Sequence, residues 1–294
     1  MKEENFRFTE RDSELLVALY KHRYLTISQL QRLFFPSMQT AYRRMRLLKK
    51  AGMVSSFDVA NISESIFAVA KDGMQCVATV LGIEPDQLKW ADVRTKPRDY
   101  YFMRHFLAIN DFRIVLTRAC DNSAVELLGF IPDYFGEMSK KGGVRKYIRD
   151  VVCDISADRE EISHTPDGVF ALRKNGKVAL FFLEIDRGTE VVSNPSKGVL
   201  KSIRFYLSYL MQGGYCRYAK DFAVSEFRGF RSLHITSTEK RLSNIREACN
   251  ALDVPTKAKL FQWITTSDRV SEESIFQPIW VSIDSIDSRS YQIG

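Results

Sequence analysis

The chain has 294 residues, of which 45% are hydrophobic and 27% are charged. This composition is too apolar for a disordered protein, and the length is enough for two domains of about 100 to 200 residues each. Lysine and arginine number 43 against 36 for aspartate and glutamate, which gives a net charge of +7 and favours polyanionic partners. No apolar run could span a membrane and the first residues lack the apolar core of a secretory signal, so we expect a cytoplasmic protein without a membrane partner.

The five cysteines and four histidines are scattered along the chain. Their spacing predicts neither a disulfide framework nor a zinc site of the CxxC type, and no HExxH motif is present. We therefore expect buried, reduced thiols, and any metal site would have to use oxygen ligands.

The first ninety residues predict three short helices followed by a hairpin. Apolar residues recur at helical spacing over 11–22 and again over 26–34, where Thr26 supplies an N-cap. A third helix is predicted from Met38 to a stop at Gly52. Residues 53–70 alternate in two short apolar runs about a polar turn, which predicts a β-wing.

The predicted third helix carries an unbalanced positive charge. Segment 38–52 has five basic residues and no acidic one. The i,i+4 ion pairs that are usual on a solvent-exposed, charged helix face therefore cannot form within it. Burying the apolar stripe of this helix leaves cations on the outside, as in a helix that enters the major groove of DNA. An ordinary solvated face is the alternative. The predicted DNA contacts on this helix are Thr40, Tyr42, Arg43, Arg44, Arg46 and Lys49.

The segments LTISQLQRLFF and TAYRRMRLLKKAGMV, followed by the wing, resemble the winged helix-turn-helix proteins of bacteria. The resemblance covers about the first ninety residues and implies double-stranded DNA as a partner. The polar, proline-bearing stretch GIEPDQLKWADVRTKPRD predicts a linker after it. We therefore expect a DNA-binding domain over residues 1–95 and a second domain over residues 96–294.

The second domain predicts an α/β fold. A long helix from Asp99 precedes a strand at 124–130, a basic loop, and strands at 165–172 and 178–185. Helix, strand, helix and strand follow, and this order predicts an α/β sandwich with a mixed central sheet. The basic loop adds three predicted contacts to the DNA backbone, namely Lys140, Lys141 and Arg145.

A hairpin in this domain brings carboxylates together. Asn175–Gly176 between two apolar runs predicts a two-residue type I′ turn, in which the two flanking lysines face each other. In that register Asp167 faces Glu184 with both side chains on one face of the sheet. Asp186, two residues beyond Glu184, joins the same face. The sequence therefore predicts that three carboxylates converge.

Like charges that face each other destabilise a sheet, so the predicted cluster calls for a cation. Mg²⁺ or Mn²⁺ is the cofactor we expect, because such an ion takes oxygen ligands and no sulfur or imidazole cluster competes for it. The alternative is that the carboxylates lie at the solvent-exposed end of the hairpin and bind Arg187 or Arg204.

The run Pro166–Gly168, the hairpin and the run Glu184–Asp186 resemble the PD-(D/E)xK restriction-endonuclease fold. That resemblance implies an Asp and a Glu that bind Mg²⁺ and a lysine two residues after the Glu that assists the attacking water. Asp186 occupies the position of that lysine. The resemblance therefore implies either that Lys201 on the following helix has taken over the role or that the domain is catalytically silent.

The segments RHFLAINDFRIVL, FLEIDRGTE and KSIRFYLSYL, together with the N-terminal winged helix, resemble the replication-relaxation family of plasmids and integrative elements, whose relatives include conjugative relaxases of the MobC type. The resemblance implies a metal-dependent nicking (relaxase-like) or relaxosome protein that acts at a transfer or replication origin during plasmid mobilisation. The catalytic residues it implies are Asp167, Glu184, Asp186 and Lys201, with Glu190 as an outer candidate.

Several alternatives stay open at this point. A covalent mechanism would use Tyr206 or Tyr209 as its nucleophile. The expected partners besides double-stranded DNA are relaxosome or replication proteins and a second copy of the chain in a homodimer. The alternative function is a non-catalytic DNA-binding regulator of transcription, replication or partition that uses a degenerate nuclease fold as its scaffold.

Overall fold

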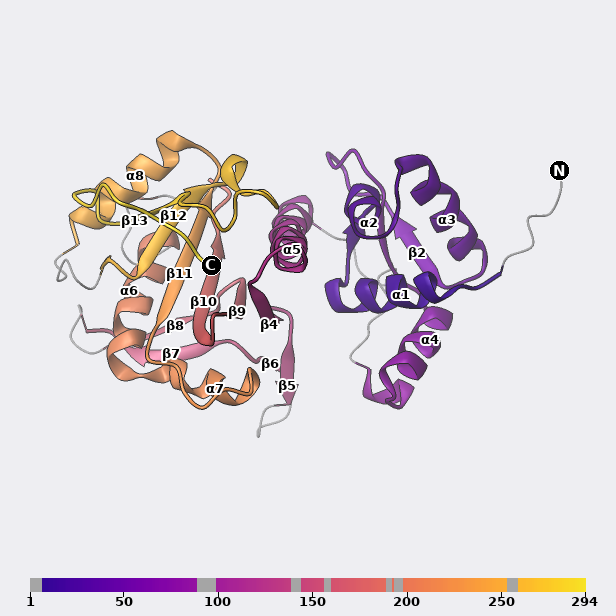
Figure 1. Ribbon diagram of the computed structural model, residues 1–294, viewed down its shortest axis with the longest axis horizontal. Coiled ribbons are helices and arrows are strands. Elements are labelled where there is room, and N and C mark those ends of the chain that lie inside the picture. The colour runs from indigo at the N-terminus through magenta and orange to yellow at the C-terminus, as the bar shows by residue number, and fades with distance from the viewer. Residues whose placement is uncertain are drawn as a thin grey trace. The chain divides into compact units, whose positions relative to one another are not determined.

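The computed structural model describes residues 7–88, 99–138, 144–155, 160–188, 192, 198–252 and 259–294. The chain divides into two compact units, Met1–Ile114 and Val115–Gly294 (Figure 1). This division falls within the long helix α5 (Tyr100–Asp121) rather than at the expected linker. Most of that linker lies outside the described residues, so the boundary near residue 95 stays a prediction.

Within its described residues, the first unit has four α-helices before α5 and a small antiparallel sheet with the strand order β1-β3-β2. The helices are α1 (Glu10–His22), α2 (Ile27–Phe34), α3 (Met38–Lys50) and α4 (Lys71–Leu81), and the strands are β1 (Leu25–Thr26), β2 (Val54–Phe57) and β3 (Ile66–Val69). The three helices and the hairpin expected from the sequence are therefore present. Capping explains where two of the helices begin, because the side chains of Thr26 and Ser37 accept hydrogen bonds from the first turns of α2 and α3.

The beginning of α5 belongs to the first unit because it completes that unit's core. Ile114 is buried in the same apolar cluster as Leu15 and Leu48. Asn110 donates a hydrogen bond to the carbonyl oxygen of Tyr24 at 2.7 Å, and Gln29 donates one to that of Leu107 at 3.0 Å. Asn110 thereby satisfies a carbonyl group just beyond the end of α1, and Gln29 joins α2 to the first half of α5. These contacts explain why the division into two units falls inside α5.

The second unit is built on a seven-stranded sheet with the order β14-β13-β12-β11-β10-β9-β4. Its strands are β4 (Glu126–Pro132), β9 (Gly168–Lys174), β10 (Lys177–Ile185), β11 (Phe230–Thr236), β12 (Gln262–Thr266), β13 (Trp280–Ser282) and β14 (Ser290–Tyr291). The strands β10, β11 and β12 run parallel and the other pairs run antiparallel, so the sheet is mixed and the predicted α/β class is confirmed.

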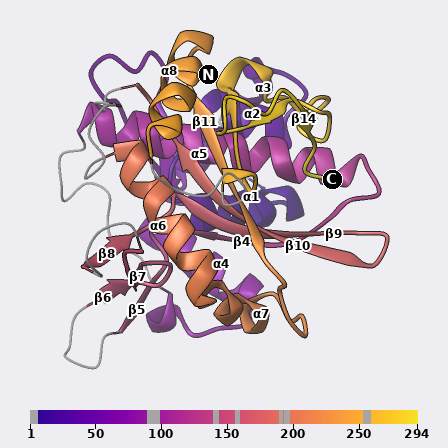
Figure 2. The ribbon, with the colours of Figure 1, turned by 90° about the vertical axis from the view of Figure 1, so that its left-hand side faces the viewer.

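Two helices cover one face of this sheet (Figures 1 and 2). They are α6 (Gly198–Gln212) and α8 (Glu239–Asn250), which connect the parallel strands. Ile203 of α6 and Ile245 of α8 share one buried core with Phe182 of β10. The second unit also contains α7 (Tyr218–Asp221) and the two-stranded pairs β5 (Gly136–Met138) with β6 (Val144–Lys146) and β7 (Asp150–Cys153) with β8 (Glu161–His164). These two small pairs were not expected from the sequence.

The register predicted for the hairpin is confirmed. Lys174 pairs with Lys177 across the turn, and Gly168 pairs with Leu183 at the far end. Asn175 and Gly176 have φ angles of 49° and 74°, as a type I′ turn requires at both central positions. Among the described helices, none combines the length and apolar character that a membrane span needs.

Candidate functional site

The outer face of α3 carries the positive charge expected from the sequence. Ala41, Met45 and Leu48 are buried, whereas Arg43 and Arg46 on the opposite side are exposed. Tyr42, Lys49 and Lys50 are exposed as well. Lys50 was not among the predicted contacts, although the same helical pattern places it on the surface.

Arg44 differs from its neighbours. It was expected to point outward, but its guanidinium forms an ion pair with Asp12 of α1, with Nε 2.7 Å from Oδ1, and its side chain is only 15% exposed. Burial alone would raise the pKa of Asp12, but hydrogen bonds from Arg44 and Thr9 outweigh it and hold the pKa below its usual value. Arg44 thus neutralises a buried carboxylate inside the first unit, which the periodicity of α3 could not indicate.

Two further predicted contacts have structural roles. The hydroxyl of Thr40 takes part in the N-terminal cap of α3 and donates to the carbonyl oxygen of Ser37 at 2.8 Å. The ammonium group of Lys49 donates to the hydroxyl of Ser56 at 2.6 Å and so joins the end of α3 to β2. Both side chains remain exposed.

The basic loop of the second unit is described only in part. Lys140 and Lys141 lie outside the described residues. Arg145 lies in β6, where it is exposed and has Glu137 of β5 as its cross-strand neighbour. The contact between this loop and DNA stays a prediction.

Glu184, near the end of β10, is held by groups from two other elements. Its Oε1 lies 2.6 Å from Nε2 of His164 on β8 and also accepts a hydrogen bond from the hydroxyl of Tyr206 on α6. Burial raises the pKa of Glu184, and the charge of nearby Asp167 adds to that effect. The carboxyl group is therefore a partner in an internal hydrogen-bond network.

The carboxylate of Asp186 accepts more hydrogen bonds than that of Glu184. Arg241 of α8 donates two hydrogen bonds to it, from Nε to Oδ2 at 2.8 Å and from Nη2 to Oδ1 at 2.9 Å. Thr236 donates to Oδ2 at 2.8 Å, and the backbone N–H of Gly188 donates to Oδ1 at 3.1 Å. Burial opposes ionisation, but these donors outweigh it and lower the pKa of Asp186. Its side chain is 5% exposed and carries its counter-ion with it.

Asp167 continues the hairpin by one residue. Its N–H donates to the carbonyl oxygen of Leu183 at 2.9 Å, and its Oδ2 accepts a hydrogen bond from the N–H of Ile185 at 2.7 Å. It therefore lies beside the end of β10, as the register argument requires, and near enough to Glu184 to affect its pKa.

The divalent-metal site expected from the sequence stays a prediction, and the contacts of Asp186 count against an ion held by all three carboxylates. Both oxygens of Asp186 already accept hydrogen bonds from Arg241, so the residues present do not fit an ion held by all three carboxylates. Among the described residues, no group of three or more His, Cys, Asp or Glu side chains is arranged to hold a metal ion. The alternative prediction, that the carboxylates bind an arginine, agrees better with the contacts of Asp186 than a metal site does. The arginine is Arg241, however. Arg204 instead binds Asp154, with Nη2 2.6 Å from Oδ2.

The other predicted catalytic groups lie apart from this network or inside the core. Burial raises the pKa of Tyr206 and of Tyr209, and both rings are at most 1% exposed, so neither hydroxyl is placed to attack DNA. Lys201 on α6 is half-buried, and within the described chain no hydrogen bond or ion pair joins it to the three carboxylates. Glu190 lies outside the described residues.

Sequence reasoning missed the partners of these carboxylates. His164, Thr236 and Arg241 come from three different elements and lie 20 to 55 residues from the groups they bind. His234 on β11 is also near, and burial lowers its pKa to about 4, so it is neutral. No local spacing pattern links these residues.

These features define an α/β protein of two units, one with an exposed basic helix and one with internally paired carboxylates. The family model described as replication-relaxation matches residues 16–224, which is more than half of the chain. The chain therefore belongs to the replication-relaxation family, and this associates it with the replication or mobilisation of plasmids and related elements. Comparison with curated proteins gives no match.

Proposed function

We propose that this chain is a sequence-specific DNA-binding protein of a plasmid or integrative element and that α3 enters the major groove of its site. The observation that carries the proposal is the outer face of α3, where Arg43, Arg46 and Lys50 are exposed on a helix that contains no acidic residue. Lysine and arginine that neutralise phosphates release counterions, and this supplies much of the affinity for DNA.

The geometry of the first unit supports this assignment. A helix of 13 residues such as α3 is about 20 Å long and has a diameter that the major groove admits. Three helices followed by a β-hairpin, β2–β3, are the elements of a winged helix-turn-helix. The hairpin loop 58–65 has two acidic residues and no basic one, so we assign the phosphate contacts to α3 rather than to this loop.

For the second unit, internal pairing of the carboxylates supports the non-catalytic alternative over metal-dependent nicking. Asp186 already has a cation bound to both oxygens, and Glu184 is occupied by His164 and Tyr206. In this proposal the unit acts as a scaffold for a partner, which could be a second copy of the chain or a protein of the replication or relaxation machinery.

The test begins with selection of a duplex site from a random library by the full chain, followed by fluorescence anisotropy with that duplex. We expect Arg43→Ala/Arg46→Ala to weaken binding at least tenfold, since a bidentate contact between arginine and a base is worth roughly 1–3 kcal/mol. The control Lys71→Ala/Lys240→Ala removes the same charge from exposed positions that do not belong to α3 and should bind like the wild type. Equal affinity of both double variants would reject α3 as the recognition helix.

A further inference from the structure

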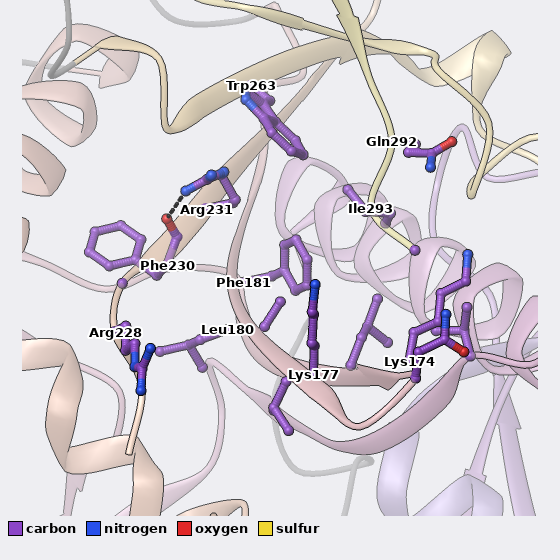
Figure 3. Close-up of a pocket in the computed structure, with 17 residues that line it drawn as sticks. Lys174, Lys177, Leu180, Phe181, Arg228, Phe230, Arg231, Trp263, Gln292 and Ile293 are labelled. Carbon is purple, nitrogen blue, oxygen red and sulfur yellow. Dashed lines mark hydrogen bonds between the residues drawn. The ribbon is translucent and has the colours of Figure 1, made fainter.

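A pocket of about 630 Å³ opens on the second unit, and none of the three carboxylates lines it. Figure 3 shows the residues that do. The pocket is lined by 17 residues, which come mainly from the hairpin β9–β10, from the start of β11 and from 292–294. Its volume is in the range of sites that bind small molecules or parts of larger ligands. Lys177 and Glu184 lie at opposite ends of β10, which separates the two sites by roughly 23 Å along the strand.

The rim of this pocket is basic. Lys174, Lys177, Arg228 and Arg231 are all exposed, and none of the 17 described residues that line the pocket is aspartate or glutamate. Lys174 and Lys177 face each other directly across the turn, an arrangement that costs stability unless an anion lies between them. Arg228 contacts Glu226 at 3.2 Å, but both side chains are mostly exposed, so this ion pair contributes little.

The floor of the pocket is apolar and partly aromatic. Phe181 and Trp263 contribute rings that are 3% and 7% exposed, and Ile293 lies beside them (Figure 3). Trp263 is held by stacking on Tyr291, with 4.8 Å between the ring centroids. The guanidinium of Arg231 lies 5.1 Å from the centroid of the Trp263 ring, which places one cation at the border of floor and rim.

We propose that this pocket binds single-stranded DNA, with phosphates at the basic rim and an unpaired base against the apolar floor. Exposed bases add flat apolar surface to a chain of negative charges, and the pocket offers the complement of both. A duplex presents its phosphates but keeps its bases stacked, so it could not use the floor. An acidic peptide would match the rim but not the floor. The inference depends on the proposed function for the choice of DNA as the polynucleotide.

The experiment measures binding of fluorescein-labelled dT20 to the full chain by anisotropy over a range of NaCl concentrations. We expect Lys174→Gln/Lys177→Gln to weaken binding about tenfold and to make the slope of log K against log salt shallower by about 1.4, since each single-strand phosphate contact contributes roughly 0.7. The charge-matched control Lys71→Gln/Lys240→Gln should keep the wild-type slope. In the wild type, dT20 should also quench tryptophan fluorescence, and this quenching should be absent from Trp263→Phe.

A crossed design separates this inference from the proposed function. Lys174→Gln/Lys177→Gln should retain binding to the selected duplex, whereas Arg43→Ala/Arg46→Ala should retain binding to dT20. Failure of the duplex arm alone would reject α3 as the recognition helix and leave the pocket assignment in place. The pocket assignment would be overturned if the lysine variant bound dT20 like the wild type, if polyglutamate competed as well as unlabelled dT20, or if rU20 bound more tightly than dT20.

Discussion

The outer face of α3 and the carboxylate cluster at the end of β10 are both strongly charged, but they differ in how far their charges are exposed to solvent. On α3, Arg43 and Arg46 face the solvent from a helix without acidic residues. At the end of β10, Asp186 is 5% exposed and bonded to Arg241 on both oxygens. A charge that the fold leaves in water can be reached by a ligand, whereas a charge that is buried with its counter-ion is already neutralised within the fold.

Neighbouring residues of α3 repeat this contrast on a smaller scale. Arg43 is exposed, whereas Arg44 lies about 100° further round the helix and is bonded to the buried carboxylate of Asp12. Two arginines that follow each other in the sequence therefore have different expected effects on stability and on DNA binding.

The largest effect is expected from Arg241→Ala. This change leaves the carboxylate of Asp186 buried without its cation, which costs about 3–5 kcal/mol for a broken buried pair. Denaturant unfolding monitored by hydrogen exchange should show that the loss of stability lies in the second unit. The double variant Arg241→Ala/Asp186→Asn should recover part of the stability, because the uncompensated charge is gone. A gain of Mn²⁺ affinity in Arg241→Ala with unchanged stability would instead support the metal site expected from the sequence.

A somewhat smaller effect is expected from Arg44→Ala, at about 3 kcal/mol in the first unit, because Asp12 keeps hydrogen bonds from Thr9. Arg43→Ala should change stability by no more than about 0.5 kcal/mol, as exposed substitutions usually do. Hydrogen exchange of the backbone amides in α1 and α3 measures the change in stability in both variants. Equal stability of the two variants would remove the distinction between the buried Arg44 and the exposed Arg43.

A change of pH should affect stability less than Arg44→Ala does, and the effect should be similar in the two units. Burial lowers the pKa of His22 in the first unit to about 3 and that of His234 in the second to about 4. The unfolded chain, with a histidine pKa near 6.5, therefore takes up protons first as the pH falls, and stability decreases. Between pH 7 and 5.5 each histidine should cost about 1 kcal/mol.

This pH effect has an internal control. The pKa values of Asp12 and Asp186 are lowered, so both carboxylates stay ionised throughout that range. His22→Gln should flatten the pH dependence of the first unit and leave that of the second unchanged. Stability that stays constant or rises between pH 7 and 5.5 would contradict the assignment of neutral, buried histidines.

Local features of the fold could be predicted from the sequence because they depend on neighbours in the chain. The turn Asn175–Gly176 fixes its own backbone angles and with them the pairing of β9 and β10. Apolar periodicity likewise identified the buried stripe of α3 and most of its exposed cations. These rules determine which face of an element a side chain points to.

The partners of charged groups could not be predicted in the same way. Arg44 is 32 residues from Asp12, and Arg241 is 55 residues from Asp186. Periodicity placed Asp186 beside the carboxylates of its own hairpin, but the cation that compensates it comes from α8, which follows α6, α7 and β11 in the chain. A cluster of like charges in a sequence therefore indicates that compensation is needed, without telling whether a metal ion or a distant arginine supplies it.

The salt dependence of duplex binding tests the role of α3 most directly. For the selected duplex, the slope of log K against log salt should become shallower by roughly 1.8 in Arg43→Ala/Arg46→Ala, since each cation that neutralises a phosphate of B-DNA contributes about 0.9. The charge-matched control Lys71→Ala/Lys240→Ala should keep the wild-type slope. The same slope in the wild type and in Arg43→Ala/Arg46→Ala would contradict the claim that the exposed cations of α3 bind DNA.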